Sequence, residues 1–150
     1  MDIKDYMFKI GDEARKASFF TSSATSEQKN NFLNNLGKRI LNNVDKIINI
    51  NKKDLDQAAK NNFDAAFIDR LTLNKKNITA MAEGLLQIEK LEDPIGKISN
   101  ERTMPSGIKV SQMRVSLGVI GMIYESRPNV AADAAGLFWT ALNGEDPTII

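Results

Sequence analysis

Apolar residues recur at spacings of three and four through the first part of the chain, and this period predicts amphipathic helices. Pro94 disfavours helix at the residue before it, so the last of these helices should end just ahead of that proline. Residues 19–26 are rich in Ser and Thr and are expected to form a linker between the first two helices. The predicted helices cover residues 2–16, residues from 25 with an apolar face that continues to 48, residues 51–60, and residues 74–91.

Beyond Pro94 the apolar period changes to that of strands. A turn at 104–107 precedes alternating residues 108–114, which predict a half-exposed strand. Residues 117–124, the most apolar run, predict a short buried strand; its two glycines lie inside it, so they do not match a dinucleotide-binding fingerprint. Residues 130–142 are rich in Ala and predict a helix packed closely on a sheet. The predicted fold class is therefore α/β, with a helical segment, a strand pair, and the opening strand–turn–helix of a larger domain.

A polar cluster from Glu125 to Asn129 follows the predicted buried strand, at a place where open α/β folds often carry function. Arg127 could bind a carboxylate or phosphate through two hydrogen bonds. The Asn129 amide is a neutral donor of the kind that stabilises an oxyanion. Glu125 could act as an acid or base, or pair with Arg127. The alternative is a capped turn, with Pro128 at the first helical position and Glu125 solvated.

The composition restricts the chemistry that this chain can perform. It contains no cysteine and no histidine, so disulfides, thiolate nucleophiles and the usual general base near neutral pH are all absent. No metal site is predicted, since the aspartates at 54 and 56 lack the spacing of a calcium loop. The net charge of +1 gives no field for nucleic acid or a membrane surface. With no apolar signal segment at the start and no run long enough to span a bilayer, we expect a cytoplasmic protein.

Residues 115–130, V-S-L-G-V-I-G-M-I-Y-E-S-R-P-N-V, resemble a segment of the gamma-glutamyl phosphate reductases, also called glutamate-5-semialdehyde dehydrogenases. This family is a branch of the aldehyde dehydrogenase superfamily, and Y-E-S-R-P-N-V is highly specific to it. The resemblance extends over about residues 1–137. Further matches are Leu55 in its local setting, D-R-L-T-L at 69–73, L-E-D-P-I-G at 91–96, S-G-I-K at 106–109 and A-D-A-A-G-L at 132–137.

The resemblance implies NADPH-dependent reduction of L-glutamate 5-phosphate to L-glutamate 5-semialdehyde, a step of proline biosynthesis that proceeds through a cysteine thiolate. That cysteine lies far downstream in the family, so no catalytic residue is carried over. Arg127 and Asn129 are expected to contact the substrate or its oxyanion, and Tyr124 and Glu125 to lie beside the cofactor. The implied organisation is a helical segment at 1–93, the first strands of a doubly wound cofactor domain at 94–137, and a divergent tail at 138–150.

The tail departs from the family, which continues after residue 137 with a next strand and the start of a cofactor phosphate site. Residues 138–150 lack the lysine and the Gly-Asn pair of that element, and no Arg-Gly-Gly follows. We therefore expect a truncated gene product that is inactive alone. The alternative is a helical binding or regulatory module that docks on a full-length reductase through the apolar side of residues 117–124. A homo-oligomer is a further expectation.

Overall fold

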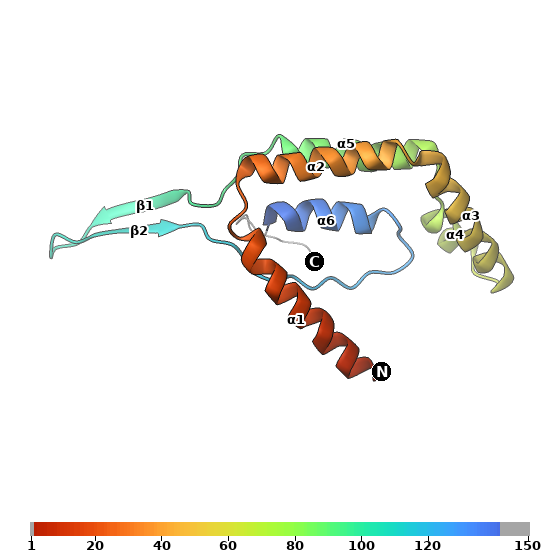
Figure 1. The fold of residues 1–150 in the computed structure, drawn as a ribbon, viewed down its shortest axis with the longest axis horizontal. Helices are drawn as coiled ribbons and strands as arrows, with labels where there is room; N and C mark the ends of the chain where they lie inside the picture. The colour runs from red at the N-terminus through yellow and green to blue at the C-terminus, as the bar shows by residue number, and fades with distance from the viewer. Residues whose placement is uncertain (1, 142–150) are drawn as a thin grey trace. The chain divides into compact units, whose positions relative to one another are not determined.

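The structure, a computed structural model, describes residues 2–141, apart from the side chains of 140 and 141. The described residues fall into two compact units. The helical unit comprises Glu27–Leu91 and Met122–Leu137; the hairpin unit comprises residues 2–26, Glu92–Gly121 and 138–141. The elements in chain order are α1 (Ile3–Thr21), α2 (Ser26–Leu41), α3 (Val44–Lys60), α4 (Ala65–Leu71), α5 (Lys75–Glu89), β1 (Ile98–Thr103), β2 (Lys109–Met113) and α6 (Val130–Ala141) (Figure 1).

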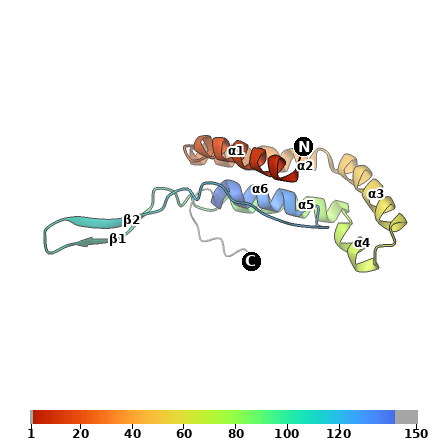
Figure 2. The same cartoon turned by 90° about the horizontal axis from the view of Figure 1, so that it is seen from below.

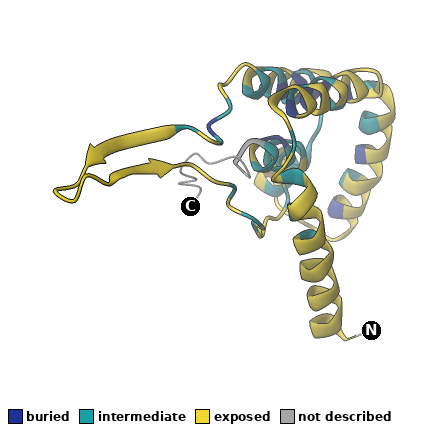
Figure 3. Ribbon diagram, turned by 60° about the vertical axis from the view of Figure 1, so that its left-hand side comes forward, coloured by how far each residue is buried: buried dark blue, intermediate teal, exposed yellow. Residues whose placement is uncertain are grey.

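The core of the helical unit lies where α2, α5 and α6 pack together, and Figure 3 shows its buried residues on these helices. Leu33, Ile78 and Leu85 are its largest fully buried side chains. A Cβ added at Gly136 would lie 2.6 Å from Leu85 Cδ2 and 3.8 Å from Leu33 Cδ2, so a side chain here would force the tip of Leu85 to move. The alanine-rich helix expected at 130–142 is therefore present over its described residues, but it packs on two helices and not on a sheet.

The division between the second and third helices differs from the prediction. The apolar face was expected to run unbroken to residue 48, whereas α2 ends at Leu41 and α3 begins at Val44. Asn51, expected in a new helix at 51–60, lies inside α3 and is 3% exposed. Apolar spacing alone could not reveal this boundary, because residues on both sides of it have the same helical period.

The linker expected at 19–26 was also placed too early, because α1 continues through Phe20 and ends at Thr21. Hydroxyls near this end donate to backbone carbonyls three residues earlier: Ser18 Oγ to Arg15 O, 2.7 Å, and Ser22 Oγ to Phe19 O, 2.9 Å. Hydroxyl side chains that bond locally in this way are compatible with the last turn of a helix. The Ser and Thr content of the segment therefore indicated a helix end and not a long linker.

The hairpin unit confirms the predicted strand pair and turn. β1 and β2 are antiparallel, with Ser99 opposite Gln112, and the turn closes through Met104 N, which donates to Ile108 O at 2.8 Å (Figure 2). Gly107 has a φ of 85°, which side-chain-bearing residues rarely adopt. All residues of both strands are exposed, so the face expected to be half covered is not covered within the described part of the chain.

The predicted buried strand at 117–124 is wrong: the segment has no strand and lies open to solvent, with Ile123 102% exposed. A parallel strand needs neighbours on its edges and helices on both faces. Within residues 2–141 the only strands are β1 and β2, which pair with each other. The described chain is mostly helical with one small sheet, which matches the incomplete α/β fold expected. No described helix is long and apolar enough to cross a membrane.

Candidate functional site

The turn that starts α6 carries the candidate residues of the polar cluster. Val130 N donates to Arg127 O at 3.1 Å, and Asn129 O accepts from Asp133 N at 3.1 Å. Ser126 has a φ of 54°, a left-handed conformation that is costly for a residue with a side chain. The turn therefore does lead into a helix, as in the capped-turn interpretation, but α6 begins at Val130, so Pro128 lies two residues before the first helical position and not at it. The Asn129 side chain donates to Asp133 in the first turn of α6.

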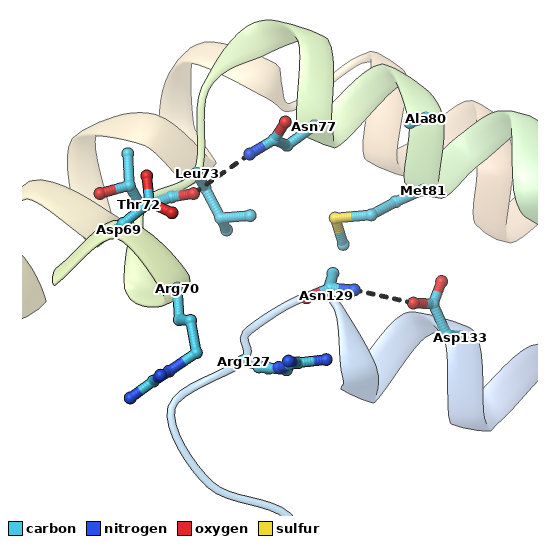
Figure 4. Close-up of a pocket in the computed structure, with 10 residues that line it drawn as sticks. All are labelled: Asp69, Arg70, Thr72, Leu73, Asn77, Ala80, Met81, Arg127, Asn129 and Asp133. Atoms are coloured by element: carbon cyan, nitrogen blue, oxygen red, sulfur yellow. Dashed lines mark hydrogen bonds between the residues drawn. The ribbon is translucent and has the colours of Figure 1, made fainter. Parts of the chain in front are cut away.

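A pocket of about 420 Å³ lies against this turn, inside the helical unit (Figure 4). Both residues predicted to contact substrate, Arg127 and Asn129, line it. The opposite wall comes from the end of α4, the connection to α5, and the first turns of α5. The lining residues are Asp69, Arg70, Thr72, Leu73, Asn77, Ala80, Met81, Arg127, Asn129 and Asp133.

Side-chain caps fix the α4–α5 wall of the pocket. Asp64 Oδ1 accepts from Phe67 N at 2.6 Å at the start of α4. Asn74 Oδ1 accepts from Asn77 N at 2.8 Å, which confirms the helix start predicted at 74. Such caps satisfy backbone N–H groups that a helix leaves unpaired. Both helices that contribute to this wall therefore begin at defined residues.

Asn51 of α3 holds the connection between those two helices. Its Nδ2 donates to Leu71 O at 2.9 Å, and its Oδ1 accepts from Leu73 N at 2.8 Å. Asn77 Nδ2 adds a bond to Thr72 O at 3.3 Å (Figure 4). A buried amide that satisfies two backbone groups replaces the regular hydrogen bonds that a connection lacks. The backbone of the pocket wall is therefore anchored to α3.

The pocket brings charges of both signs together from three elements. Arg70 comes from α4 and Arg127 from the turn before α6; within the described residues neither guanidinium forms an ion pair. Asp69 comes from α4 and Asp133 from α6. Asp133 Oδ2 accepts from Asn129 Nδ2 at 2.9 Å, which orients the Asn129 amide along one side of the pocket (Figure 4).

Tyr124 and Glu125, predicted to lie beside a cofactor, are exposed and do not line the pocket. The suggested ion pair between Glu125 and Arg127 is not formed. Gly118 and Gly121 precede no helix start directly, since α6 begins at Val130, so they do not form the strand-to-helix turn of a dinucleotide-binding fingerprint. Among the described residues no cluster of acidic side chains is arranged to hold a metal.

Sequence reasoning missed the α4–α5 wall as a place for chemistry. The residues D-R-L-T-L at 69–73 served only to support the family resemblance, yet four of the five line the pocket. Asp133 was likewise treated only as part of a matching helix. The sequence did contain a signal: the D-R-L-T-L and R-P-N motifs belong to the same resemblance, and two such motifs can line one site although they lie far apart in the chain.

No family model matches this sequence. Among the solved structures similar to it are two gamma-glutamyl phosphate reductases. The enzyme from Thermotoga maritima matches 91% of this chain at 28% identity with a TM-score of 0.85, over 33% of its own length. The enzyme from Saccharomyces cerevisiae matches 90% at 29% identity with a TM-score of 0.83, over 34% of its own length. The chain thus spans about a third of these reductases. In fold and in sequence, it matches a fragment of the gamma-glutamyl phosphate reductase family.

Proposed function

We propose that this chain forms part of the substrate site for the NADPH-dependent reduction of L-glutamate 5-phosphate to L-glutamate 5-semialdehyde. The observation that carries the proposal is the pocket, because D-R-L-T-L at 69–73 and R-P-N at 127–129 line it together. Both motifs belong to the resemblance with the reductases, whose structures this fold matches. A cytoplasmic location and a place in proline biosynthesis belong to the same proposal.

Within this proposal, Arg127 binds the anionic acyl phosphate and Asn129 stabilises the oxyanion. An unpaired guanidinium can make two parallel hydrogen bonds to a phosphate. The Asn129 amide has two N–H groups, and one is donated to Asp133, so the second is available to a ligand in the pocket. Donors fixed before the reaction stabilise developing negative charge more effectively than donors that must reorient.

For the cofactor, we propose only which residues lie beside it, because the described residues form part of its site. A nicotinamide cofactor would supply the hydride for this reduction. Tyr124 and Glu125 are the residues proposed to lie beside it, and no described helix starts directly after a glycine-rich turn that could hold its phosphates. The chain also has no cysteine for the thiolate step of the family. We therefore propose that the chain is inactive alone.

The decisive experiment fuses residues 1–137 to the part of the Thermotoga maritima reductase that lies beyond its match with this chain. The fusion should catalyse the reverse reaction, phosphate-dependent reduction of NADP⁺ with L-glutamate 5-semialdehyde, and the unfused chain should not. Asn129→Ala in the fusion should lower kcat by about 10²–10³-fold, the range for removal of one oxyanion donor. Asn31→Ala, at an exposed position of α2, serves as the control. Turnover by the unfused chain, or a folded Asn129→Ala fusion with unchanged kcat, would contradict the proposal.

A second candidate function is a module that docks on a full-length reductase. It is favoured by the exposed apolar side chains of the segment at 117–124, which include Leu117, Val119, Ile123 and Tyr124. Exposed apolar surface of this kind marks either an interaction site or an aggregation-prone edge. Co-elution of the chain with a full-length reductase, lost on Ile123→Asp, would support docking, and self-association without co-elution would exclude it.

A further inference from the structure

We infer that Asp133 is a positioning residue for the oxyanion donor: its carboxylate holds the Asn129 amide in one orientation, and it acts on the reaction only through Asn129. This inference rests on the proposed function, because it concerns the donor that the same site uses. The resemblance assigned no role to Asp133, which was only part of a matching helix. Loss of the Asp133 carboxylate should therefore lower kcat although this residue makes no contact of its own with the substrate.

The first argument is the hydrogen bond between the two side chains. Asn129 Nδ2 donates to Asp133 Oδ2 at 2.9 Å, and both residues are half-buried (Figure 4). The nitrogen and oxygen ends of an Asn amide have nearly the same shape, so shape alone does not decide which end faces a neighbour. An ionised carboxylate only accepts hydrogen bonds, so it binds the nitrogen end and excludes the flipped orientation. Asp133 therefore fixes which side of the Asn129 amide carries the N–H groups.

The second argument is that Asn129 is attached to Asp133 at two points. Besides the bond between the side chains, Asp133 N donates to Asn129 O at 3.1 Å in the first turn of α6. The turn before this helix is itself closed by Val130 N, which donates to Arg127 O at 3.1 Å. The fold thus orders the Asn129 side chain before any ligand binds, and the cost in side-chain entropy is not borne by the reaction.

The third argument is that Asp133 has the wrong sign of charge for direct contact with an acyl phosphate. A carboxylate repels an anionic ligand, yet Asp133 lines the pocket from α6. Its bond to Asn129 gives the carboxylate a role there that needs no contact with the ligand. An aspartate in the first turn of a helix also interacts favourably with the helix dipole, which is a purely structural role. The two roles predict different results when Asn129 is removed as well.

The first test measures the order of the Asn129 side chain in the whole 150-residue chain, by ¹⁵N relaxation of its NH₂ group. In the unaltered chain the order parameter should be close to the rigid-backbone value of about 0.85, and in Asp133→Ala it should fall below about 0.6. Alanine is the strongest helix former, so this variant should keep α6. Asp45→Ala removes an acidic residue from the first turn of α3 and is the control, with no expected change. A mobile Asn129 amide in the unaltered chain, or a rigid one in Asp133→Ala, overturns the inference.

The second test is a double-mutant cycle on kcat in the fusion of residues 1–137. Asp133→Ala should lower kcat at least about tenfold in the fusion, but less than about twofold in the Asn129→Ala fusion, because no donor is then left to position. A role through the helix dipole alone would give the same fold-loss in both backgrounds.

The matched control for the cycle is another bond between an Asn and a carboxylate. Asn34 Nδ2 donates to Glu89 Oε1 at 3.3 Å, and neither residue lines the pocket, so Glu89→Gln should leave kcat unchanged. Equal losses for Asp133→Ala in both backgrounds, or no loss in either, overturn this inference and leave the proposed function standing. An unchanged kcat in Asn129→Ala overturns the proposed function itself. If the fusion is inactive, the relaxation measurement on the whole chain decides.

Discussion

The helical unit and the hairpin unit differ in how much apolar surface each one buries by itself. In the helical unit, three helices bury Leu33, Ile78 and Leu85, and polar side chains fix the connection beside the pocket. In the hairpin unit, both strands are exposed along their whole length. A helix satisfies its backbone within one segment and buries one face on neighbouring helices, whereas the faces of a two-stranded hairpin stay exposed until further strands or helices pack on it. The candidate site lies in the unit that has its own core.

The largest expected effect on stability comes from a substitution in the core of the helical unit. Leu33→Ala should lower the free energy of unfolding of the helical unit by about 2–5 kcal/mol, the range for a large-to-small change at a buried leucine. Leu91→Ala, at a mostly exposed leucine of the same unit, should change it by no more than about 0.5 kcal/mol. Urea unfolding followed by far-UV circular dichroism measures both. Similar losses for the two variants would show that α2, α5 and α6 share no specific core.

The polar anchor of the pocket wall should give the next largest effect. Asn51→Ala removes two hydrogen bonds and leaves Leu71 O and Leu73 N without their partner, which should cost about 1–3 kcal/mol. The same variant should lower kcat of the fusion described above, because the connection that it releases lines the pocket. Asn49→Ala, at an exposed position of the same helix, is the control and should leave both measurements unchanged. Loss of stability with unchanged kcat would show that the Asn51 hydrogen bonds do not shape the site.

These two expectations also show which parts of the structure could be predicted from the sequence. Local patterns predicted most of the helices, the turn at 104–107 and the cap at Asn74, since each depends on neighbours in the chain. They did not predict α4, and they misplaced the boundary between α2 and α3. The role of Asn51 depends on residues about twenty positions later, and one sequence offers no pattern for such a partner. The error at residues 117–124 has the same cause, because burial of that run requires further strands beside it. Arg127 and Asn129 could be named from their chemistry, but the wall that faces them could not.

The smallest expected effects come from two Gly→Ala substitutions in the hairpin unit, one in a turn and one in a helix. Their effects on stability should have opposite signs. Gly107 has a φ of 85°, so Gly107→Ala should weaken the hairpin by about 1 kcal/mol. Gly11 lies in the exposed helix α1 with open space where a Cβ would be, so Gly11→Ala should stabilise that helix by about 0.5–1 kcal/mol. Cross-strand NOEs between Ser99 and Gln112 report the first change, and amide exchange in α1 reports the second. Intact NOEs in Gly107→Ala would contradict the prediction. They would mean that the turn tolerates a side chain at this position and that pairing between β1 and β2 is sufficient to set the register.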